Sequence, residues 1–291
     1  MTRPVVLVTG AGGYIGRHVV QALVERDADV VTVERNPADA PPPPGVRRID
    51  ADIFADPGDR FERLGSPDVC LHLAWEAGFV HNAPVHVERL PQHLDLLREL
   101  ARSGVGRLAV IGSMHEVGYH EGPVVASTPT SPLSLYGVAK NALRQALEIE
   151  LAGSGTVLQW LRCFYVTGDD EGNASVFSKI AAAAARGERT FPFTSGRNLY
   201  DFLDVGELAQ QIAAVTLQDE VTGIINCCSG VPMSLGERAE QFIRDRGLDI
   251  ELDYGRFPDR PYDSPGIWGD ATLVRDVLER EAAARDAAAP R

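Results

Sequence analysis

The stretch Val5-Val6-Leu7-Val8-Thr9-Gly10-Ala11-Gly12-Gly13-Tyr14-Ile15-Gly16 decides the expected fold. Its apolar beginning predicts a buried strand, and the pattern of residues 17–25 predicts a helix directly after the glycines. Glycines at positions 10, 13 and 16 let the backbone turn sharply, approach a diphosphate closely and pack the helix against the strand. The free amides at the helix N-terminus would then bind a phosphate. The alternative is a glycine turn with only a structural role.

A second apolar strand, residues 29–33, follows this helix and ends at Glu34. In a dinucleotide-binding unit, an acidic residue at this point accepts hydrogen bonds from the adenosine ribose. The Glu34 carboxylate would repel a 2′-phosphate, whereas the neighbouring Arg35 would attract one. We therefore expect NAD(H) as the cofactor, with a slight preference over NADP(H).

The composition indicates a globular protein with a substantial core, because 44% of the 291 residues are hydrophobic and 24% are charged. Twenty-eight basic residues stand against 41 acidic residues, which gives a formal net charge of −13. This balance argues against nucleic acid and anionic membranes as partners, because both need a basic footprint. No apolar run reaches the ~20 residues of a membrane helix and no secretory signal is recognisable, so a cytoplasmic location is expected.

The four cysteines lie in apolar segments without metal-ligand spacing: Cys70, Cys163, Cys227 and Cys228. Adjacent cysteines rarely form a disulfide with each other. We therefore expect buried, reduced thiols and no metal site.

Strands and helices alternate along the first part of the chain. Apolar runs predict further strands at 46–49, 69–75, 108–111 and 157–166, and helical patterns at 92–103 and 136–151. This alternation predicts an α/β fold, namely a Rossmann-type, doubly wound parallel sheet with ligands at the carboxyl ends of its strands. The prolines at 41–44 mark a surface loop.

The rhythm changes near Gly168. Helices are expected at 176–186 and 205–217 and a strand at 223–228, followed by irregular, proline-rich sequence. We assign residues 1–167, with returning elements around 199–228, to the dinucleotide-binding domain. Residues 168–198 and 229–291 form the expected smaller C-terminal, substrate-binding lobe. Its Ala-rich end, 279–291, is expected to fray after a terminal helix.

Tyr136 and Lys140 begin a predicted helix, and their spacing places the phenol and the ammonium on one face. A nearby ammonium favours the phenolate, so Lys140 would lower the pKa of Tyr136 from ~10 toward neutrality and make it an acid or base. Ser113 follows the strand at 108–111, whose carboxyl end should lie near the glycine turn. The alternative for Tyr136 and Lys140 is a pair of ordinary surface residues.

With these motifs the chain resembles the extended short-chain dehydrogenase/reductase superfamily, specifically its nucleotide-sugar epimerases and ketoreductases, the NAD-dependent epimerase/dehydratase family. The resemblance spans nearly the whole sequence and is carried by Thr9 to Gly16, Asp52-Ile53, His72-Leu73-Ala74, Gly112 to Gly118 and Tyr136 to Lys140. It implies that Ser113 binds the reacting oxygen, that Tyr136 exchanges its proton, and that Lys140 holds the nicotinamide ribose. Counting back from Tyr119 would instead place Met114 in the serine position, but only Ser113 can donate a hydrogen bond.

The resemblance also implies two sets of binding residues. The expected cofactor contacts are Gly10, Gly12, Gly13, Tyr14, Ile15, Gly16, Glu34, Arg35, Asp52, Ile53, Leu73, Ala74, Trp75, Tyr136, Lys140 and Tyr165. The expected substrate contacts are His115, Glu116, Asn173, Ser175, Lys179 and Arg260, where the Arg260 fork of donors suits a diphosphate. His81 and Asn82 lie in a loop that would approach the sugar, and His72 is expected to be a core histidine. Tyr200 stands where the family has an arginine.

Three functions fit these residues. The first is an NAD(P)H-dependent 4-ketoreductase of a dTDP-4-keto-6-deoxyhexose. The run from His115 to Tyr119 resembles the corresponding run of such reductases most. The alternative is an NAD-dependent 4-epimerase of a nucleotide hexose that uses the same residues. The third is a non-catalytic dinucleotide-sensing protein. The superfamily resemblance further implies a homodimer packed through the helices at 92–103 and 136–151.

Overall fold

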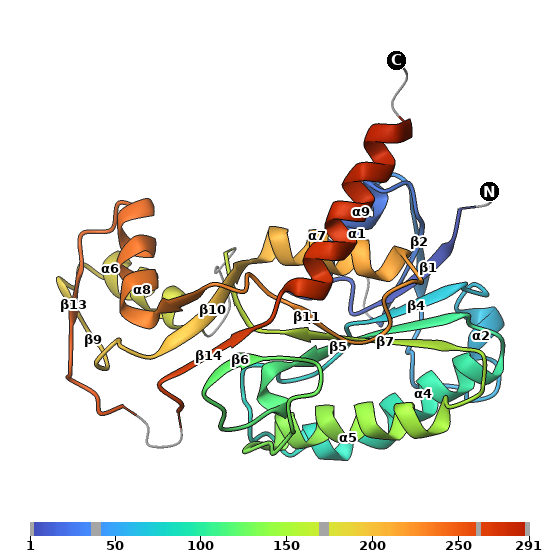
Figure 1. Ribbon diagram of the computed structural model, residues 1–291, viewed down its shortest axis with the longest axis horizontal. Helices are drawn as coiled ribbons and strands as arrows, with labels where there is room; N and C mark the ends of the chain where they lie inside the picture. The colour runs from blue at the N-terminus through green and yellow to red at the C-terminus, as the bar shows by residue number, and fades with distance from the viewer. Residues whose placement is uncertain (1–2, 36–41, 169–174, 260–262, 289–291) are drawn as a thin grey trace.

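A seven-stranded parallel sheet organises the computed structural model, which describes residues 3–35, 42–168, 175–259 and 263–288 (Figure 1). The strand order is β11-β7-β5-β4-β1-β2-β3. The bounds are β1 (Val5–Thr9), β2 (Asp29–Glu34), β3 (Val46–Asp50), β4 (Val69–His72), β5 (Arg107–Ser113), β7 (Val157–Cys163) and β11 (Gly223–Cys227). The order reverses between β1 and β4, whose last residues Thr9 and His72 are paired. This reversal is the point at which doubly wound sheets bind their ligands, and the expected Rossmann-type fold is confirmed.

Helices cover both faces of this sheet, as Figure 1 shows. One face carries α1 (Gly16–Val24), α7 (Val205–Leu217) and α9 (Thr272–Ala288), which bury Val19, Leu23, Leu208, Ile212, Val274 and Val277. The other carries α4 (Leu90–Arg102) and α5 (Leu135–Glu150), with Leu96, Leu97, Leu100, Leu143 and Leu147 in a second core. The short helices α2 (Arg60–Arg63) and α3 (Val85–Glu88) pack against α4 and α5. Burial of both faces explains the near-continuous apolar strands.

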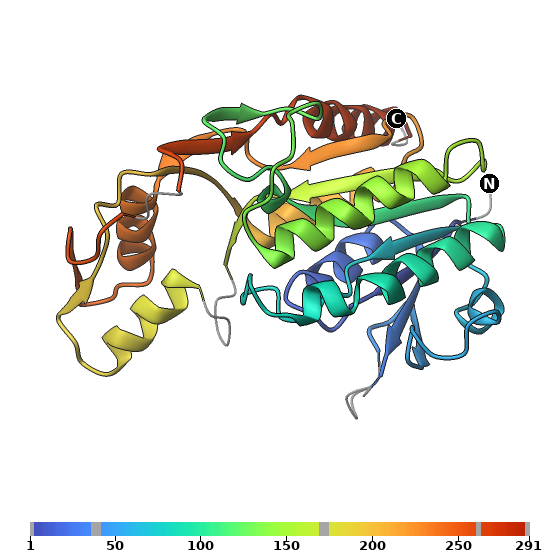
Figure 2. The same ribbon diagram turned by 90° about the horizontal axis from the view of Figure 1, so that it is seen from below.

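A smaller lobe lies beyond the carboxyl ends of the strands (Figure 2). It contains α6 (Val176–Ala185), α8 (Leu235–Asp245) and the paired strands β9 (Thr190–Pro192) and β13 (Glu251–Asp253). Its own core is formed by Phe177, Ile180, Ala183, Phe193, Ala239, Phe242 and Ile250. A second sheet joins the lobe to the main domain through β12 (Pro232–Ser234), β10 (Leu199–Asp204), β14 (Gly266–Gly269) and β6 (Gly122–Val124), with β8 (Tyr165–Thr167) beside β10.

Four expectations about the elements are wrong. The strand expected at 69–75 ends at His72, and the one at 157–166 divides at Phe164, because β8 leaves the large sheet and pairs with β10. The sequence after 228 is not simply irregular, since Ser234 caps α8 and Phe242 anchors it. Residues 279–288 continue α9, where Arg26 pairs with Glu281. This helix packs on α7 and β11, so residues 272–288 belong with the large domain and not with the lobe.

Three further findings concern the cysteines, the length of the helices and the metal-ligating side chains. All four cysteines are free and buried, as expected. Among the described residues, no helix is both long enough and apolar enough to cross a membrane. In the same part of the chain, no three metal-ligating side chains come together as a metal site.

Candidate active site

The glycine turn after β1 is too tight to accept side chains at two of its positions. Gly10 has a φ of +74°, and a Cβ there would lie 2.6 Å from the backbone nitrogen of Ala74. A Cβ on Gly16 would overlap the carbonyl oxygen of Gly10, so α1 can start this close to β1 only with glycine. The Gly13 amide closes the turn by donating to the Gly10 carbonyl at 3.0 Å.

The outer side of the same turn is open, as a dinucleotide requires. Gly12 and Gly13 are exposed, and the nearest atom to a Cβ on Gly12 is the Glu34 Oε1 at 3.9 Å. Glu34 therefore reaches from the end of β2 toward the turn, where an adenosine ribose would lie beside the diphosphate. The adjacent Arg35 pairs with Glu76 at 3.2 Å. These residues fit a bound NAD: a glycine cradle for its diphosphate and a carboxylate for its ribose.

The other expected cofactor residues lie at or just after the ends of other strands, and Tyr14 lies in the glycine turn itself. Asp52 follows β3 and accepts from the Phe54 amide at 2.9 Å, while Ile53 is buried. The Ala74 amide donates to the Thr9 hydroxyl at 3.3 Å, which holds the segment 73–75 against β1. Tyr14 donates to the Gly168 carbonyl at 2.5 Å, and Tyr165 packs on Tyr200.

Ser113, at the last position of β5, lies against Tyr136. Its hydroxyl hydrogen-bonds the Tyr136 phenol and accepts from the His115 amide at 3.3 Å. The neighbouring Met114 is buried in the main core. The structure thus brings Ser113, and not Met114, to the phenol, in agreement with the argument from hydrogen-bonding capacity.

Helix α5 presents Tyr136 and Lys140 to the same place. The helix begins where the Ser134 side chain accepts from the Gly137 amide at 3.2 Å. Lys140 is 1% exposed, donates to the Ile111 carbonyl at 2.8 Å and lies 3.8 Å from the centre of the Trp75 ring. Trp75 is therefore a cation–π partner of the ammonium.

Burial, rather than the Lys140 charge, dominates the acidity of the pair. Burial raises the pKa of Tyr136, and the hydrogen bond from Ser113 opposes this shift only in part. Burial lowers the pKa of Lys140 to about 7, against the opposing charge of Glu116. The expectation that Lys140 brings the phenol toward neutrality is therefore wrong for this structure, because the site excludes water from both groups.

Histidines flank the phenol. The His81 ring stacks on the Tyr136 ring with 5.7 Å between their centres, and it lies tilted against the His115 ring with 4.2 Å between their centres. The Tyr136 amide donates to the His81 carbonyl at 2.9 Å, which fixes the loop of His81 to the start of α5. Burial lowers the pKa of His115 to about 4, so this ring is neutral near neutral pH. His81 and His115 are thus close enough to the phenol to contact a sugar bound there.

The expected substrate contact of Glu116 is wrong. Its side chain is 0% exposed and lies beneath the site, where it accepts from the Ser113 amide and the Trp160 indole. Of the other residues expected to bind substrate, Ser175 caps α6 by accepting from the Ser178 amide at 3.1 Å, and Lys179 is exposed on the same helix. Asn173 and Arg260 lie outside the described residues.

His86, His93 and Cys163 lie near the site and were not expected there. The ring of His72, the expected core histidine, hydrogen-bonds the ring of His93 at 2.8 Å, and the His93 ring stacks 4.4 Å from the Trp75 ring. His86 accepts from the Trp75 indole at 3.0 Å, and Cys163 ends β7 opposite Ser113. The helical spacing of His86 and His93 gave no sign of this, because only the packing of α3 and α4 brings them to the segment after β4.

A Rossmann-type sheet with a serine, tyrosine and lysine at its strand ends defines an enzyme of the short-chain dehydrogenase/reductase type. Comparison with known proteins agrees. The family model of the NAD dependent epimerase/dehydratase family matches residues 6–228. A dTDP-6-deoxy-L-talose 4-dehydrogenase (NAD(+)) from Aggregatibacter actinomycetemcomitans is 40% identical over 268 residues, which cover 91% of this chain and 98% of that protein.

More distant relatives include epimerases. A UDP-glucose 4-epimerase from Azospirillum brasilense is 26% identical over 302 residues, which cover 94% of this chain and 86% of that protein. The solved UDP-N-acetylglucosamine 4-epimerase from Methanobrevibacter ruminantium M1 has a TM-score of 0.81 at 23% identity, over 95% of this chain and 92% of that chain. The protein belongs to the NAD-dependent epimerase/dehydratase family of extended short-chain dehydrogenases/reductases.

Proposed function

We propose that the protein is an NAD-dependent oxidoreductase that interconverts the 4-hydroxyl and 4-keto forms of a dTDP-6-deoxyhexose. The observation that carries this proposal is the 40% identity, over nearly the whole of both chains, to a dTDP-6-deoxy-L-talose 4-dehydrogenase. The joined Ser113, Tyr136 and Lys140 side chains support it, because they supply the groups that such a proton transfer needs. Reduction of the 4-keto sugar, as expected from the sequence, is one direction of this reaction.

In the oxidation direction, the sugar loses a hydride from C4 and a proton from its C4 hydroxyl. NAD⁺ held at the glycine turn would supply the hydride acceptor. Tyr136, in its ionised form, takes the proton from the C4 hydroxyl and becomes the neutral phenol. Ser113 holds the C4 oxygen by a hydrogen bond. The Lys140 ammonium, fixed by the Ile111 carbonyl and the Trp75 ring, places a positive charge 5.9 Å from the centre of the phenol ring, which offsets part of the cost that burial imposes on the ionised form. In the reduction direction Tyr136 returns the proton.

The cofactor preference follows from the end of β2. Glu34 extends toward the glycine turn and would repel a 2′-phosphate. Arg35, the residue that would attract one, is paired with Glu76. We therefore propose NAD(H) over NADP(H).

The proposal extends to the residues that contact the substrate and to the oligomeric state. We propose that His81 and His115 contact the hexose and that Asn173, Ser175, Lys179 and Arg260 serve the nucleotide and its diphosphate. A homodimer through α4 and α5 is supported by apolar side chains that α5 leaves exposed, Val138 at 43% and Ile149 at 77%.

The test is direct. Purified protein is mixed with dTDP-6-deoxy-L-talose and NAD⁺, and with dTDP-4-keto-6-deoxyhexoses and NADH, while absorbance at about 340 nm follows the cofactor, which carries the transferred hydride. The same assays with NADP(H) test the preference. Product NMR identifies the carbon that is oxidised. No cofactor turnover with any of these sugars would overturn the proposal.

A 4-epimerase is the second candidate, because the same three side chains serve it and a UDP-glucose 4-epimerase is among the relatives. An epimerase converts UDP-glucose to UDP-galactose with no net change in absorbance and retains its NAD. Epimerisation without net cofactor turnover would therefore favour this second candidate.

Tyr136→Phe is expected to reduce turnover by roughly 10²–10⁴-fold, since it removes the group that exchanges the proton. Binding of NAD(H), measured by fluorescence or calorimetry, should stay near the wild-type value because the glycine turn is untouched. Turnover at the wild-type rate would exclude Tyr136 as the acid and base.

A further inference from the structure

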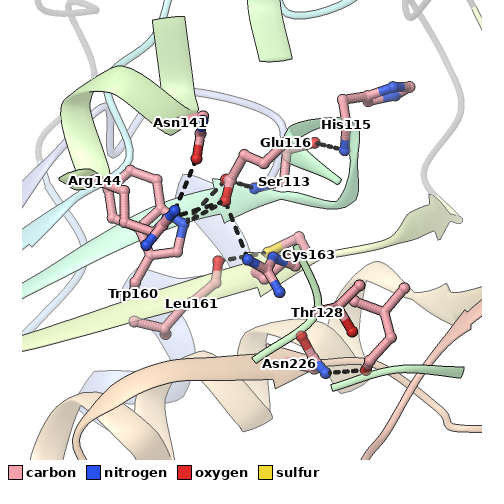
Figure 3. A network of polar contacts seen from close by, with 12 residues as sticks. Ser113, His115, Glu116, Thr128, Asn141, Arg144, Trp160, Leu161, Cys163 and Asn226 are labelled. Carbon is pink, nitrogen blue, oxygen red and sulfur yellow. Dashed lines mark hydrogen bonds and ion pairs between the residues drawn. The ribbon is translucent and has the colours of Figure 1, made fainter. Parts of the chain in front are cut away.

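A buried carboxylate lies directly under the proposed catalytic groups. Glu116 is 0% exposed and ends the single turn η1 (Met114–Glu116) that follows β5. Its Oε1 accepts from the Ser113 amide at 2.6 Å, and both of its oxygens accept from the Trp160 indole at 3.0 Å. Figure 3 shows the carboxylate between Ser113, Trp160 and Arg144, with the His115 ring turned away from it.

These contacts tie together the elements that carry the site. Trp160 lies on β7, the strand next to β5. Its indole can reach Glu116 because residue 112 is glycine, since a Cβ at that position would overlap the indole ring. Arg144 lies on α5, one turn beyond Lys140, and its Nε is 3.9 Å from the carboxylate. One side chain thus links the end of β5, the middle of β7 and the helix that bears Tyr136.

This turn holds Ser113 through both its side chain and its backbone. Its oxygen accepts from the His115 amide, while its own amide donates to Glu116. The reciprocal pair is a capping box, which normally stabilises the start of a helix. Here the helix has a single turn, so the arrangement mainly holds the serine whose hydroxyl meets the phenol.

We propose that Glu116 is a positioning residue for the reaction: its buried carboxylate keeps Ser113 against Tyr136 and holds a negative charge beneath Lys140. The inference rests on the proposed function, in which these three residues act on the sugar. Glu116 itself touches neither the sugar nor the cofactor, since η1 and its neighbours cover it completely.

The surrounding charges define how this role should appear in a pH profile. Arg162 on β7 is 0% exposed and pairs with Glu116 at 3.5 Å, while Arg144 is shared between Glu116 and Glu148. Lys140 also faces Cys163 of β7, and it faces the buried His72 and His93 of β4 and α4, whose rings are neutral. Burial raises the pKa of Glu116, while the Arg162 charge and the hydrogen bonds from Ser113 and Trp160 oppose that shift and favour the carboxylate form. Removing the Glu116 charge leaves this neighbourhood more positive.

A more positive neighbourhood disfavours the protonated, charged form of Lys140 and favours the ionised form of Tyr136. The Glu116 charge raises the pKa of Lys140 and also that of Tyr136. Loss of that charge therefore lowers both, and both limbs of the pH profile move to lower pH. A carboxylate that only held the turn in place would not move the profile.

Two substitutions separate shape from charge. Glu116→Gln keeps the length and one accepting oxygen for the Ser113 amide but removes the charge; its kcat should fall at least about tenfold, with KM changed little and the pH profile shifted down. Glu116→Asp keeps the charge but shortens the reach; its kcat should fall while the profile stays in place. Glu99→Gln is the matched control, because Glu99 is a carboxylate with a 16% exposed side chain that pairs with a buried arginine, Arg60, away from the site.

Thermal melting and NAD binding establish which variants are folded. If Glu116→Gln does not fold, because it leaves Arg162 without its counter-charge, Glu116→Gln with Arg162→Gln replaces it. That double variant leaves the net charge unchanged, so its kcat and not its pH profile is the measurement, and kcat should again fall. Wild-type kcat and an unmoved pH profile in folded Glu116→Gln, or wild-type kcat in the folded double variant, would overturn the inference. A shift of equal size in Glu99→Gln would also overturn it.

Amide hydrogen exchange keeps this result distinct from the proposed function. The peptide that contains Ser113 should exchange faster in Glu116→Gln than in wild type, because a neutral acceptor replaces a charged one. Faster exchange with a wild-type protein that oxidises none of the sugars would sustain the positioning role and defeat the proposed reaction. An active wild type with unchanged exchange and kinetics in the variant would do the reverse.

Discussion

Single residues set how closely the backbone approaches the cofactor. Gly16 and Gly12 lie in one turn but face different surroundings: a Cβ on Gly16 overlaps the Gly10 carbonyl, whereas the nearest neighbour of one on Gly12 is 3.9 Å away. The first glycine is therefore required by the fold. The second leaves open the space that a diphosphate would occupy.

This difference predicts opposite phenotypes for two alanine substitutions. Gly16→Ala should lower the free energy of unfolding by about 1–3 kcal/mol, because the backbone must shift to relieve the overlap. Gly12→Ala should leave stability near wild type and weaken NAD binding. Denaturant unfolding and calorimetric titration measure the two effects, and equal stability losses would contradict the assignment.

At the scale of elements, helix α5 connects local capping to chemistry. Its Ser134 cap fixes the first turn, and Tyr136 lies in that turn. Helix α8 in the lobe is capped in the same way, with Ser234 accepting from the Glu237 amide at 3.1 Å. The two caps are thus equivalent in geometry and differ in what their helices carry.

Ser134→Ala and Ser234→Ala should each destabilise the protein by about 1 kcal/mol, the usual cost of losing a cap. Only Ser134→Ala should also reduce kcat, since fraying of the first turn of α5 displaces the phenol. Thermal melts and initial rates on the same samples compare them. A matching fall of kcat in Ser234→Ala would show that the effect is not specific to α5.

For the whole molecule, buried histidines make stability depend on pH. Burial lowers the pKa of His93 to about 3 and that of His72 well below its ordinary value of 6.5. Below pH 6.5 the unfolded chain binds a proton on each of these two histidines, whereas the native protein keeps both rings neutral. Their contribution is therefore present above pH 6.5 and is lost as the pH falls from there toward the native pKa values.

Between pH 6.5 and pH 5, each of these two histidines should cost about 2 kcal/mol of stability. Urea unfolding at the two pH values measures the loss. His93→Gln should reduce it, because one titrating group is removed while an amide can still bond His72. His120→Gln, at a partly exposed position, serves as the control, and an unchanged pH dependence in His93→Gln would refute the explanation.

The sequence by itself determined the glycine turn, the parallel sheet and the choice of Ser113, Tyr136 and Lys140 as the side chains that meet at the candidate site. These features depend on local spacing, which the chain carries wherever it folds: apolar periodicity, turn glycines and residues one helical turn apart. The tertiary structure alone decided what surrounds them. Glu116 follows Ser113 in a run that suggested a sugar contact. Trp160, which lies 44 residues after Glu116 and on the neighbouring strand β7, instead donates a hydrogen bond to the Glu116 carboxylate in the interior. The pKa of Tyr136 was also decided there, because burial depends on the packing of α5 against β5 and β7, which no local pattern contains.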